Sequence, residues 1–352
     1  MRIIVTGNMG YVGPLVVRHL RRRWPDAEII GFDAGFFAHC LTSKSALPET
    51  LLTAQYFGDV REFPAKLLAG TDAVVHLAAI SNDPMGNRFE TVTHDINTVA
   101  SLRLARLAHD SGVRNFVFAS SCSVYGFAEG HSRREDDPLN PLTAYARSKI
   151  ATEEGLATLA NGPMTISCLR FATACGMSDR LRLDLVLNDF AASAASNGTI
   201  SILSDGTPWR PLIDVADMAR GIEWAITRRP EQGGRILSVN VGSNSWNYQV
   251  RDLAEAVAAA FPGTTVHVNP NAQPDRRSYR VDFSRFTELA PDHQPQIGLA
   301  QSVQRLRTGL AAIDYRQSDL KNSDMIRLNV LGRMVEQGQL SSDLRWQGSR
   351  AV

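Results

Sequence analysis

Cysteine is scarce in this chain, and long hydrophobic runs are absent. The four cysteines form neither a Cys-x-x-Cys pair nor the spacing of a zinc site, so we expect free thiols in a reducing compartment and no metal site. No apolar run approaches the roughly 20 residues that a membrane span needs. The chain opens directly on a predicted strand and shows no signal peptide. These features predict a cytoplasmic protein with no membrane partner.

An excess of charge of either sign is also missing. Lys and Arg total 37 against 36 for Asp and Glu, so no global basic field is available to gather nucleic acid. The 352 residues exceed a typical single domain and predict two lobes that share one cleft. The sequence therefore predicts a two-lobed globular protein without a nucleic-acid partner.

Short apolar strands alternate with helical patterns in the first half of the chain. The predicted strands are 3–5, 28–33, 73–78, 116–120 and 166–171. Continuous apolar strands that alternate with helices are typical of a parallel sheet covered on both faces. The predicted fold class is therefore α/β, a Rossmann-type doubly wound parallel sheet with a smaller C-terminal α/β lobe.

The pattern becomes less regular from about residue 179. Residues 181–195 predict an apolar-rich helix, and residues 236–242 predict a late strand that returns to the main sheet. These features predict a division of the chain into two parts. The expected boundaries are 1–178 with 212–245 for the first domain, and 179–211 with 246–352 for the second lobe.

A glycine-rich turn follows the first predicted strand and opens a helix. Gly7 permits the tight turn, Gly10 lets the backbone approach a pyrophosphate, and Gly13 allows close helix packing. The helix N-terminus adds free N–H groups and the positive end of its dipole. The spacing predicts a dinucleotide site. The other loop residues expected to contact the cofactor are Met9, Tyr11 and Val12.

Asp33 ends the second predicted strand, about 20 residues beyond the glycine turn, where a carboxylate binds the adenosine ribose hydroxyls. A carboxylate at this place repels a 2′-phosphate. No Arg or Lys lies between Asp33 and Lys44 to bind one. The sequence therefore predicts NAD rather than NADP.

Tyr145 and Lys149 form a Tyr-x-x-x-Lys motif on a predicted helix. Residues four apart lie on the same helix face, so the Lys149 ammonium is expected near the Tyr145 phenol. A nearby positive charge lowers the pKa of a tyrosine, which can then act as a general base. Each motif alone also fits a solvated helix face or a simple turn. Their order along the chain predicts a nicotinamide-dependent redox site: a glycine loop comes first, Ser121 follows at a strand end, and the Tyr145–Lys149 pair comes last.

Further motifs extend in a fixed order along almost the whole chain. They are Thr6-Gly7-x-x-Gly10-x-x-Gly13, Gly58-Asp59-Val60, His76-Leu77-Ala78-Ala79, Asn97, Ser120-Ser121-x-x-Val124-Tyr125-Gly126, Pro141-x-x-x-Tyr145-x-x-x-Lys149, Asn188, Trp209-Arg210-Pro211, Asp214-Val215-x-Asp217 and Asp275-Arg276-Arg277-Ser278-Tyr279-x-Val281-Asp282. With these motifs the chain resembles the extended short-chain dehydrogenase/reductase superfamily, in its NAD-dependent nucleotide-sugar epimerase and dehydratase branch. The resemblance implies NAD in the first domain, a nucleotide-diphosphate sugar in the second lobe, and a homodimer.

The resemblance also implies roles for individual residues. Ser121 would be the catalytic serine beside Tyr145 and Lys149, with Ser120 as the alternative for that role. The residues implied in cofactor binding are Asp59, Val60, Leu77, Ala78, Ala79, Asn97, Tyr145 and Lys149. The residues implied in substrate binding are Ser81, Ser121, Cys122, Ser123, Thr173, Asn188, Arg210 and Arg276.

The expected reaction depends on the residues that follow Ser121. A 4,6-dehydratase of this branch carries Asp-Glu directly after its catalytic hydroxyl residue, where this chain has Cys122-Ser123. C4 epimerisation through a transient 4-keto sugar remains as the expected reaction, because it needs no further acid or base. A nucleotide-sugar dehydrogenase or 4-ketoreductase that releases its cofactor is the alternative, and a non-catalytic NAD-sensing protein is another. Cys122 is either a packing residue or an acid/base group. Thr173 stands where galactose epimerases carry an asparagine that touches the substrate, so the sequence does not identify the substrate sugar.

Overall fold

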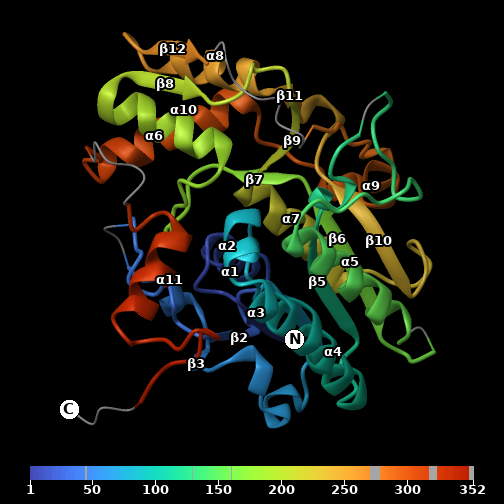
Figure 1. Ribbon diagram of the computed structural model, residues 1–352. Coiled ribbons are helices and arrows are strands. Elements are labelled where there is room, and N and C mark those ends of the chain that lie inside the picture. Colours follow the sequence, from blue (N-terminus) through green and yellow to red (C-terminus); the bar gives the residue numbers. More distant parts are fainter. Residues whose placement is uncertain (44–45, 129, 160, 270–277, 317–322, 349–352) are drawn as a thin grey trace.

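A seven-stranded parallel sheet forms the centre of the computed structural model, which describes residues 1–352 except 44–45, 129, 160, 270–277, 317–322 and 349–352 (Figure 1). The strand order is β10-β6-β5-β4-β1-β2-β3. The strands are β1 (Arg2–Thr6), β2 (Glu28–Asp33), β3 (Ala54–Phe57), β4 (Ala73–His76), β5 (Asn115–Ser121), β6 (Thr165–Phe171) and β10 (Ile236–Val241). The strand order reverses between β1 and β4, which is the topological switch point of a doubly wound sheet. The predicted Rossmann-type fold is confirmed.

Helices cover both faces of this sheet, because successive strand residues point to opposite sides. Val117 of β5 packs in one core, whereas its neighbours Phe116 and Phe118 pack in the other. The first core is covered by α1 (Gly13–Arg23) and α7 (Val215–Thr227). The second is covered by α4 (Ser101–Asp110) and α5 (Ala144–Ala157). The continuous apolar strands thus form two cores, one on each face.

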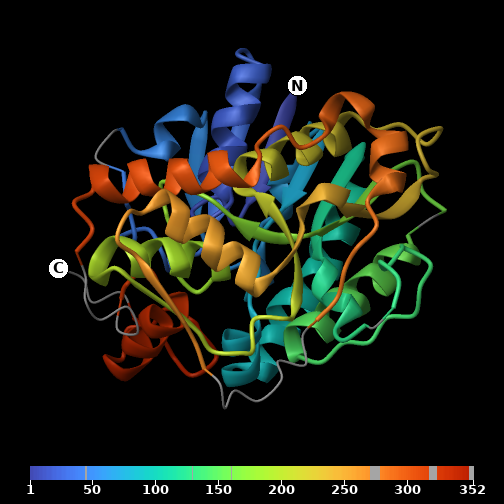
Figure 2. The ribbon, with the colours of Figure 1, turned by 90° about the horizontal axis from the view of Figure 1, so that it is seen from above.

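The second lobe consists of two small sheets and a layer of helices above the main sheet. One sheet has the order β11-β9-β7 and the other pairs β12 with β8. Their strands are β7 (Thr173–Cys175), β8 (Thr199–Ile202), β9 (Trp209–Asp214), β11 (Asn247–Gln249) and β12 (Thr265–Val268). The helices α6 (Val186–Asn197), α8 (Val250–Ala260) and α10 (Leu299–Ala312) lie side by side in this lobe (Figure 2).

Short helical elements connect these layers. They are α2 (Asp83–Arg88), α3 (Glu90–His94), α9 (Ser284–Leu289), η1 (Pro48–Leu51), η2 (Val60–Glu62), η3 (Ala65–Leu68), the π-helical η4 (Asp95–Ala100), η5 (Cys122–Tyr125), η6 (Asn244–Trp246) and η7 (Pro291–His293). Within the described ranges, no helix combines the length and apolar character needed to cross a bilayer. The four cysteines are free and buried, as the sequence predicts.

Two segments differ from the sequence prediction. Residues 181–185 are not helical, and α6 begins only at Val186. The last helix, α11 (Arg327–Glu336), was expected in the second lobe. Instead, Val330 and Leu331 of α11 pack in the same core as Phe116 of the first domain. Figure 1 places α11 beside the β2–β3 edge, so the packing joins this C-terminal segment to the cofactor half.

A buried ion pair ties α5 to β6. The Arg170 guanidinium donates to both carboxylate oxygens of Glu153, and both side chains are less than 8% exposed. Glu153 also accepts hydrogen bonds from the hydroxyls of Ser120 and Ser238. This network lies directly behind the strand end that carries Ser121.

Candidate active site

A cavity of about 930 Å³ opens at the carboxyl ends of the central strands, at the switch point between the neighbouring strands β1 and β4. Open α/β sheets bind their ligands at this place. Most residues predicted for the site line the cavity. They are Gly7, Gly10, Tyr11, Val12, Asp33, Asp59, Val60, Leu77, Ala78, Ala79, Ser81, Ser121, Ser123, Tyr145, Lys149, Thr173 and Arg210.

Other predicted site residues do not line the cavity. They are Met9, Gly13, Asn97, Cys122 and Asn188. Arg276 lies outside the described residues. Among the residues that the structure does describe, no group of three or more His, Cys, Asp or Glu side chains could hold a metal ion.

The glycine turn packs so closely that it excludes side chains. Gly7 has a φ of +73°, and a Cβ there would lie 2.5 Å from the Ala78 nitrogen. A Cβ on Gly13 would lie 2.0 Å from the Asn8 carbonyl oxygen. The first contact holds the turn after β1 against the loop after β4, and the second holds the start of α1 against the turn, whose residues Gly10, Tyr11 and Val12 line the cavity. The turn therefore fits a dinucleotide pyrophosphate.

Asp33 is fixed at the end of β2 by two backbone donors. Its carboxylate accepts from the Met9 N–H at 2.9 Å and from the Gly35 N–H at 2.8 Å. Burial raises the pKa of Asp33, and these two hydrogen bonds oppose the increase. Met9 thus contributes a backbone donor to Asp33, and its side chain lies outside the cavity. Lone pairs remain on the carboxylate for ribose hydroxyls.

NAD is expected to bind at least tenfold more tightly than NADP, a factor that about 1.4 kcal/mol supplies. The Asp33 carboxylate would repel a 2′-phosphate. The neighbouring Arg180 cannot readily compensate, because its guanidinium is paired with Glu49 at 2.7 Å. Titration calorimetry with both dinucleotides checks this prediction. Equal affinities, or tighter binding of NADP, would show that Asp33 does not select the cofactor.

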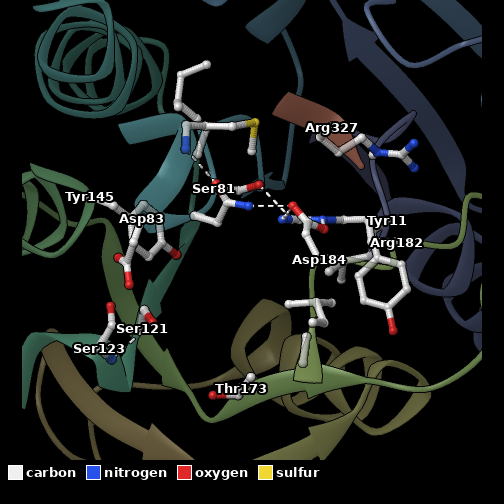
Figure 3. A pocket seen from close by; sticks show the side chains of 18 of the residues that line it. Tyr11, Ser81, Asp83, Ser121, Ser123, Tyr145, Thr173, Arg182, Asp184 and Arg327 are labelled. Atoms are coloured by element: carbon white, nitrogen blue, oxygen red, sulfur yellow. Dashed lines mark hydrogen bonds and ion pairs between the residues drawn. The ribbon is translucent and has the colours of Figure 1, made fainter. Parts of the chain in front are cut away.

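Tyr145, Ser121 and Lys149 meet at one end of the cavity. Thr143 caps α5, with its hydroxyl accepting from the Ala146 N–H, and so fixes the first turn that carries Tyr145. Lys149 lies one turn further on, with its Nζ 5.5 Å from the Tyr145 ring centroid. The Lys149 Nζ donates to the Ala119 carbonyl at 2.7 Å. In Figure 3 the side chains of Tyr145 and Ser121 lie on the same side of the cavity.

The expected lowering of the tyrosine pKa is not found in the structure. Burial raises the pKa of Tyr145 to about 12, and a hydrogen bond with Ser121 only partly opposes this. Burial also lowers the pKa of Lys149 to about 7, although Glu153 acts in the opposite direction. The spacing of the two residues is as predicted. Desolvation outweighs the attraction between charges that the spacing alone suggests.

Asn97 supports the site from behind the cavity wall. Its amide oxygen accepts from the Ile80 N–H, and its amide nitrogen donates to the Ile80 carbonyl and to the Ser148 hydroxyl. The side chain is 1% exposed. Asn97 therefore holds the backbone after β4 in place and does not itself face the cavity.

Asn188, predicted to bind substrate, is buried and does not line the cavity. Its amide accepts from the Gly176 N–H and donates to the Tyr11 hydroxyl and the Arg182 carbonyl. These bonds occupy the buried side chain and link the glycine turn to the second lobe. A diphosphate would have to displace at least one of them.

Cys122, for which packing and acid/base roles were both expected, lies outside the cavity lining. The side chain is fully buried, and its thiol donates to the Arg170 carbonyl at 3.1 Å. Burial raises the pKa of this thiol well above its ordinary value. The thiol is therefore protonated and points away from the cavity, which favours a packing role.

We expect Cys122→Ala to retain most of the activity, because the thiol does not reach the cavity. Removing the thiol leaves only a small void in the core, which should lower the free energy of unfolding by only about 1 kcal/mol. Steady-state kinetics and thermal unfolding of the same preparation check both statements. An alanine variant that folds like the parent protein but has no turnover would make the thiol an acid/base group.

Sequence reasoning missed a pair of charged residues in the middle of the cavity. Arg182 donates to both carboxylate oxygens of Asp184 at 2.9 Å and to the Ser81 hydroxyl at 2.8 Å. The segment Arg180-Leu181-Arg182-Leu183-Asp184 alternates charged and apolar residues, which is the pattern of an extended chain rather than a helix. Leu181 and Leu183, which alternate with the charged residues, are buried. That alternation could have identified the pair.

The glycine turn, the carboxylate at the end of β2 and the serine-tyrosine-lysine group together are typical of nicotinamide-dependent enzymes. The chain belongs to the NAD dependent epimerase/dehydratase family, whose model matches residues 3–242. Members of this family act on nucleotide sugars with NAD as cofactor. The sequence-based assignment to this branch is confirmed.

Individual relatives within the family catalyse different reactions. A dTDP-glucose 4,6-dehydratase of Streptomyces griseus is 29% identical over 314 residues, covering 88% of this chain and 92% of the relative. A UDP-glucose 4-epimerase of Mycolicibacterium smegmatis is 27% identical over 316 residues, covering 86% and 96%. A UDP-glucose-4-epimerase from Stenotrophomonas maltophila, solved with NAD and formylated UDP-arabinopyranose, has a TM-score of 0.76 at 21% identity, with coverage of 89% and 99%. This structural similarity supports the fold.

Proposed function

We propose that this protein is a nucleotide-sugar 4-epimerase that acts through a transient 4-keto sugar. The observation that carries the proposal is the composition of the cavity wall beside Tyr145. Ser121 and Ser123 line it, while Cys122 points away, so the two places where a dehydratase carries Asp-Glu supply no carboxylate. A hydroxyl and a phenol suffice to move one proton at C4.

In this mechanism Tyr145 in its ionised form, the phenolate, takes the proton of the sugar 4-hydroxyl and later returns it. Ser121 holds the same oxygen by a hydrogen bond. When bound, oxidised NAD would accept the hydride from C4, and its positively charged nicotinamide would favour the ionised form of the phenol. Lys149 would bind the nicotinamide ribose and add positive charge near the phenol. Arg210, which also lines the cavity, would bind the substrate diphosphate, for which a planar guanidinium is well suited.

Dehydration is the second candidate, because Asp83 brings a carboxylate to the same part of the cavity. Figure 3 shows Asp83 on the side of Tyr145, Ser121 and Ser123. Its Oδ1 accepts from the Thr143 hydroxyl at 2.7 Å, so it is held next to the first turn of α5. A carboxylate placed there could remove a proton from C5 of a 4-keto sugar.

A panel of nucleotide sugars incubated in deuterated water separates the candidates. C4 epimerisation should give an epimer without solvent deuterium and without accumulation of NADH. A dehydratase would give a 4-keto-6-deoxy product, or another elimination product, that carries deuterium from the solvent. A dehydrogenase or ketoreductase would change the NADH absorbance in proportion to product. Binding of NAD without any of these products would instead favour a sensor.

A further inference from the structure

The C-terminal segment, residues 323–348, is anchored to the cofactor half by contacts far apart in the sequence. Arg61, next to Asp59 and Val60, which the resemblance implies in cofactor binding, donates to the Asp343 carbonyl at 2.8 Å. The Trp346 indole donates to the Ala34 carbonyl, one residue after Asp33, at 2.7 Å. These bonds and the buried apolar face of α11 hold the segment against the end of β2, where adenosine binds in Rossmann folds.

Arg327 begins α11 and lines the cavity, although it is only 1% exposed. Its Nη2 donates to the Arg180 carbonyl at 2.8 Å, and its Nη1 donates to the Asp324 carbonyl at 3.3 Å. The guanidinium carbon lies 4.9 Å from the Phe37 ring centroid. Within the described chain, the partners of this guanidinium are carbonyl oxygens and an aromatic face, and it forms no ion pair.

The two neighbouring buried arginines of the same wall are neutralised. Arg180 pairs with Glu49, and Arg182 pairs with Asp184. Arg327 therefore brings to the cavity a positive charge that carbonyl dipoles solvate, and among the described residues no carboxylate forms an ion pair with it. Burying such a charge is costly unless an anion completes the site. Burial accordingly lowers the pKa of Arg327 to about 10, which still leaves it a cation at neutral pH.

Figure 3 shows Arg327 at the end of the cavity where Tyr11 and Arg182 lie, away from Tyr145. The cavity wall next to it is formed by Phe36 and Phe37, which follow the ribose-binding Asp33. We propose that Arg327 binds the pyrophosphate of NAD, so that the C-terminal segment forms part of the cofactor site and slows release of the dinucleotide. This inference rests on the NAD dependence of the family and is independent of the reaction at C4.

Arg327→Gln tests the proposal, since glutamine keeps an N–H donor for the Arg180 carbonyl but removes the charge. Arg333→Gln is the matched control, because Arg333 lies on the same helix, is partly exposed, pairs with Asp324 and does not line the cavity. The measurement is the rate at which bound NAD exchanges with isotopically labelled NAD, followed by rapid filtration. We expect Arg327→Gln to accelerate exchange by roughly ten- to a hundredfold, the effect of losing a charge-assisted hydrogen bond. Arg333→Gln should exchange like the parent protein.

Thermal unfolding with and without excess NAD separates binding from a purely structural role. A binding role predicts that NAD raises the unfolding temperature less in Arg327→Gln than in the parent protein. The proposal would be overturned if Arg327→Gln lowered the unfolding temperature equally with and without NAD and left the rate of NAD exchange unchanged. Weaker UDP binding with unchanged NAD exchange would also overturn it, because the charge would then serve the substrate. If the glutamine variant does not fold, Arg327→Lys keeps the charge without the planar fork. The lysine variant should still exchange bound NAD several-fold faster than the parent protein, and exchange at the parent rate would contradict the proposal.

Discussion

Replacing Tyr145 with phenylalanine is expected to reduce turnover by roughly 10²–10⁴-fold, the range that general acid–base catalysis supplies. The ring would keep its place on α5, but the hydroxyl that exchanges a proton with the sugar would be lost. Steady-state kinetics on whichever nucleotide sugar the panel identifies give the turnover. Binding of NAD should change little, because the glycine turn and Asp33 lie elsewhere in the cavity.

Tyr56→Phe serves as the control for this substitution. Tyr56 is exposed on β3 and does not line the cavity, so the same loss of a hydroxyl there should leave turnover unchanged. If Tyr145→Phe turned over like the parent protein, Tyr145 would not be the proton-transferring group. An equal loss in both variants would indicate a general effect of the substitution.

Glu153→Gln is expected to lower the free energy of unfolding by about 3–5 kcal/mol. The substitution keeps the size of the side chain but leaves the Arg170 guanidinium buried without its counter-charge. It also changes the hydrogen bonds that Glu153 accepts from the hydroxyls of Ser120 and Ser238. Chemical denaturation followed by tryptophan fluorescence measures the change.

The adjacent Glu154 offers a matched control, because it is exposed on the same helix. Glu154→Gln should shift the free energy of unfolding by no more than about 0.5 kcal/mol, as is usual for exposed positions. Similar stabilities for the two variants would show that the buried pair does not stabilise this fold.

The central sheet could be predicted because its signals are local. Ile3, Ile4 and Val5 are all apolar, and a strand buried on both faces needs such a run. The glycine turn, Asp33 and the Tyr145–Lys149 pair are equally local, since each is fixed by its distance from a strand end or along one helix. For these residues, spacing along the chain determined position in the cavity.

The features that the sequence did not predict depend on packing between distant segments. Cys122 and Asn188 stand at the places that the resemblance implies, but contacts with Arg170 and Tyr11 turn them away from the cavity. Burial also reversed the expected pKa shift of Tyr145, which no spacing rule could reveal. Nothing in the local sequence of α11 indicates which half it packs against. Its position at the cofactor cleft, and with it the role proposed for Arg327, required the structure.

The central claim is that hydride leaves and returns to the same carbon within one turnover. A nucleotide sugar carrying deuterium at C4, incubated with the protein and a slight excess of unlabelled NAD, tests this most directly. The account predicts that the C4 epimer retains the deuterium at C4 and that none appears in free cofactor, as read by NMR and mass spectrometry. Loss of the label from C4, its transfer to C6 or its accumulation in released NADH would contradict C4 epimerisation with a retained cofactor.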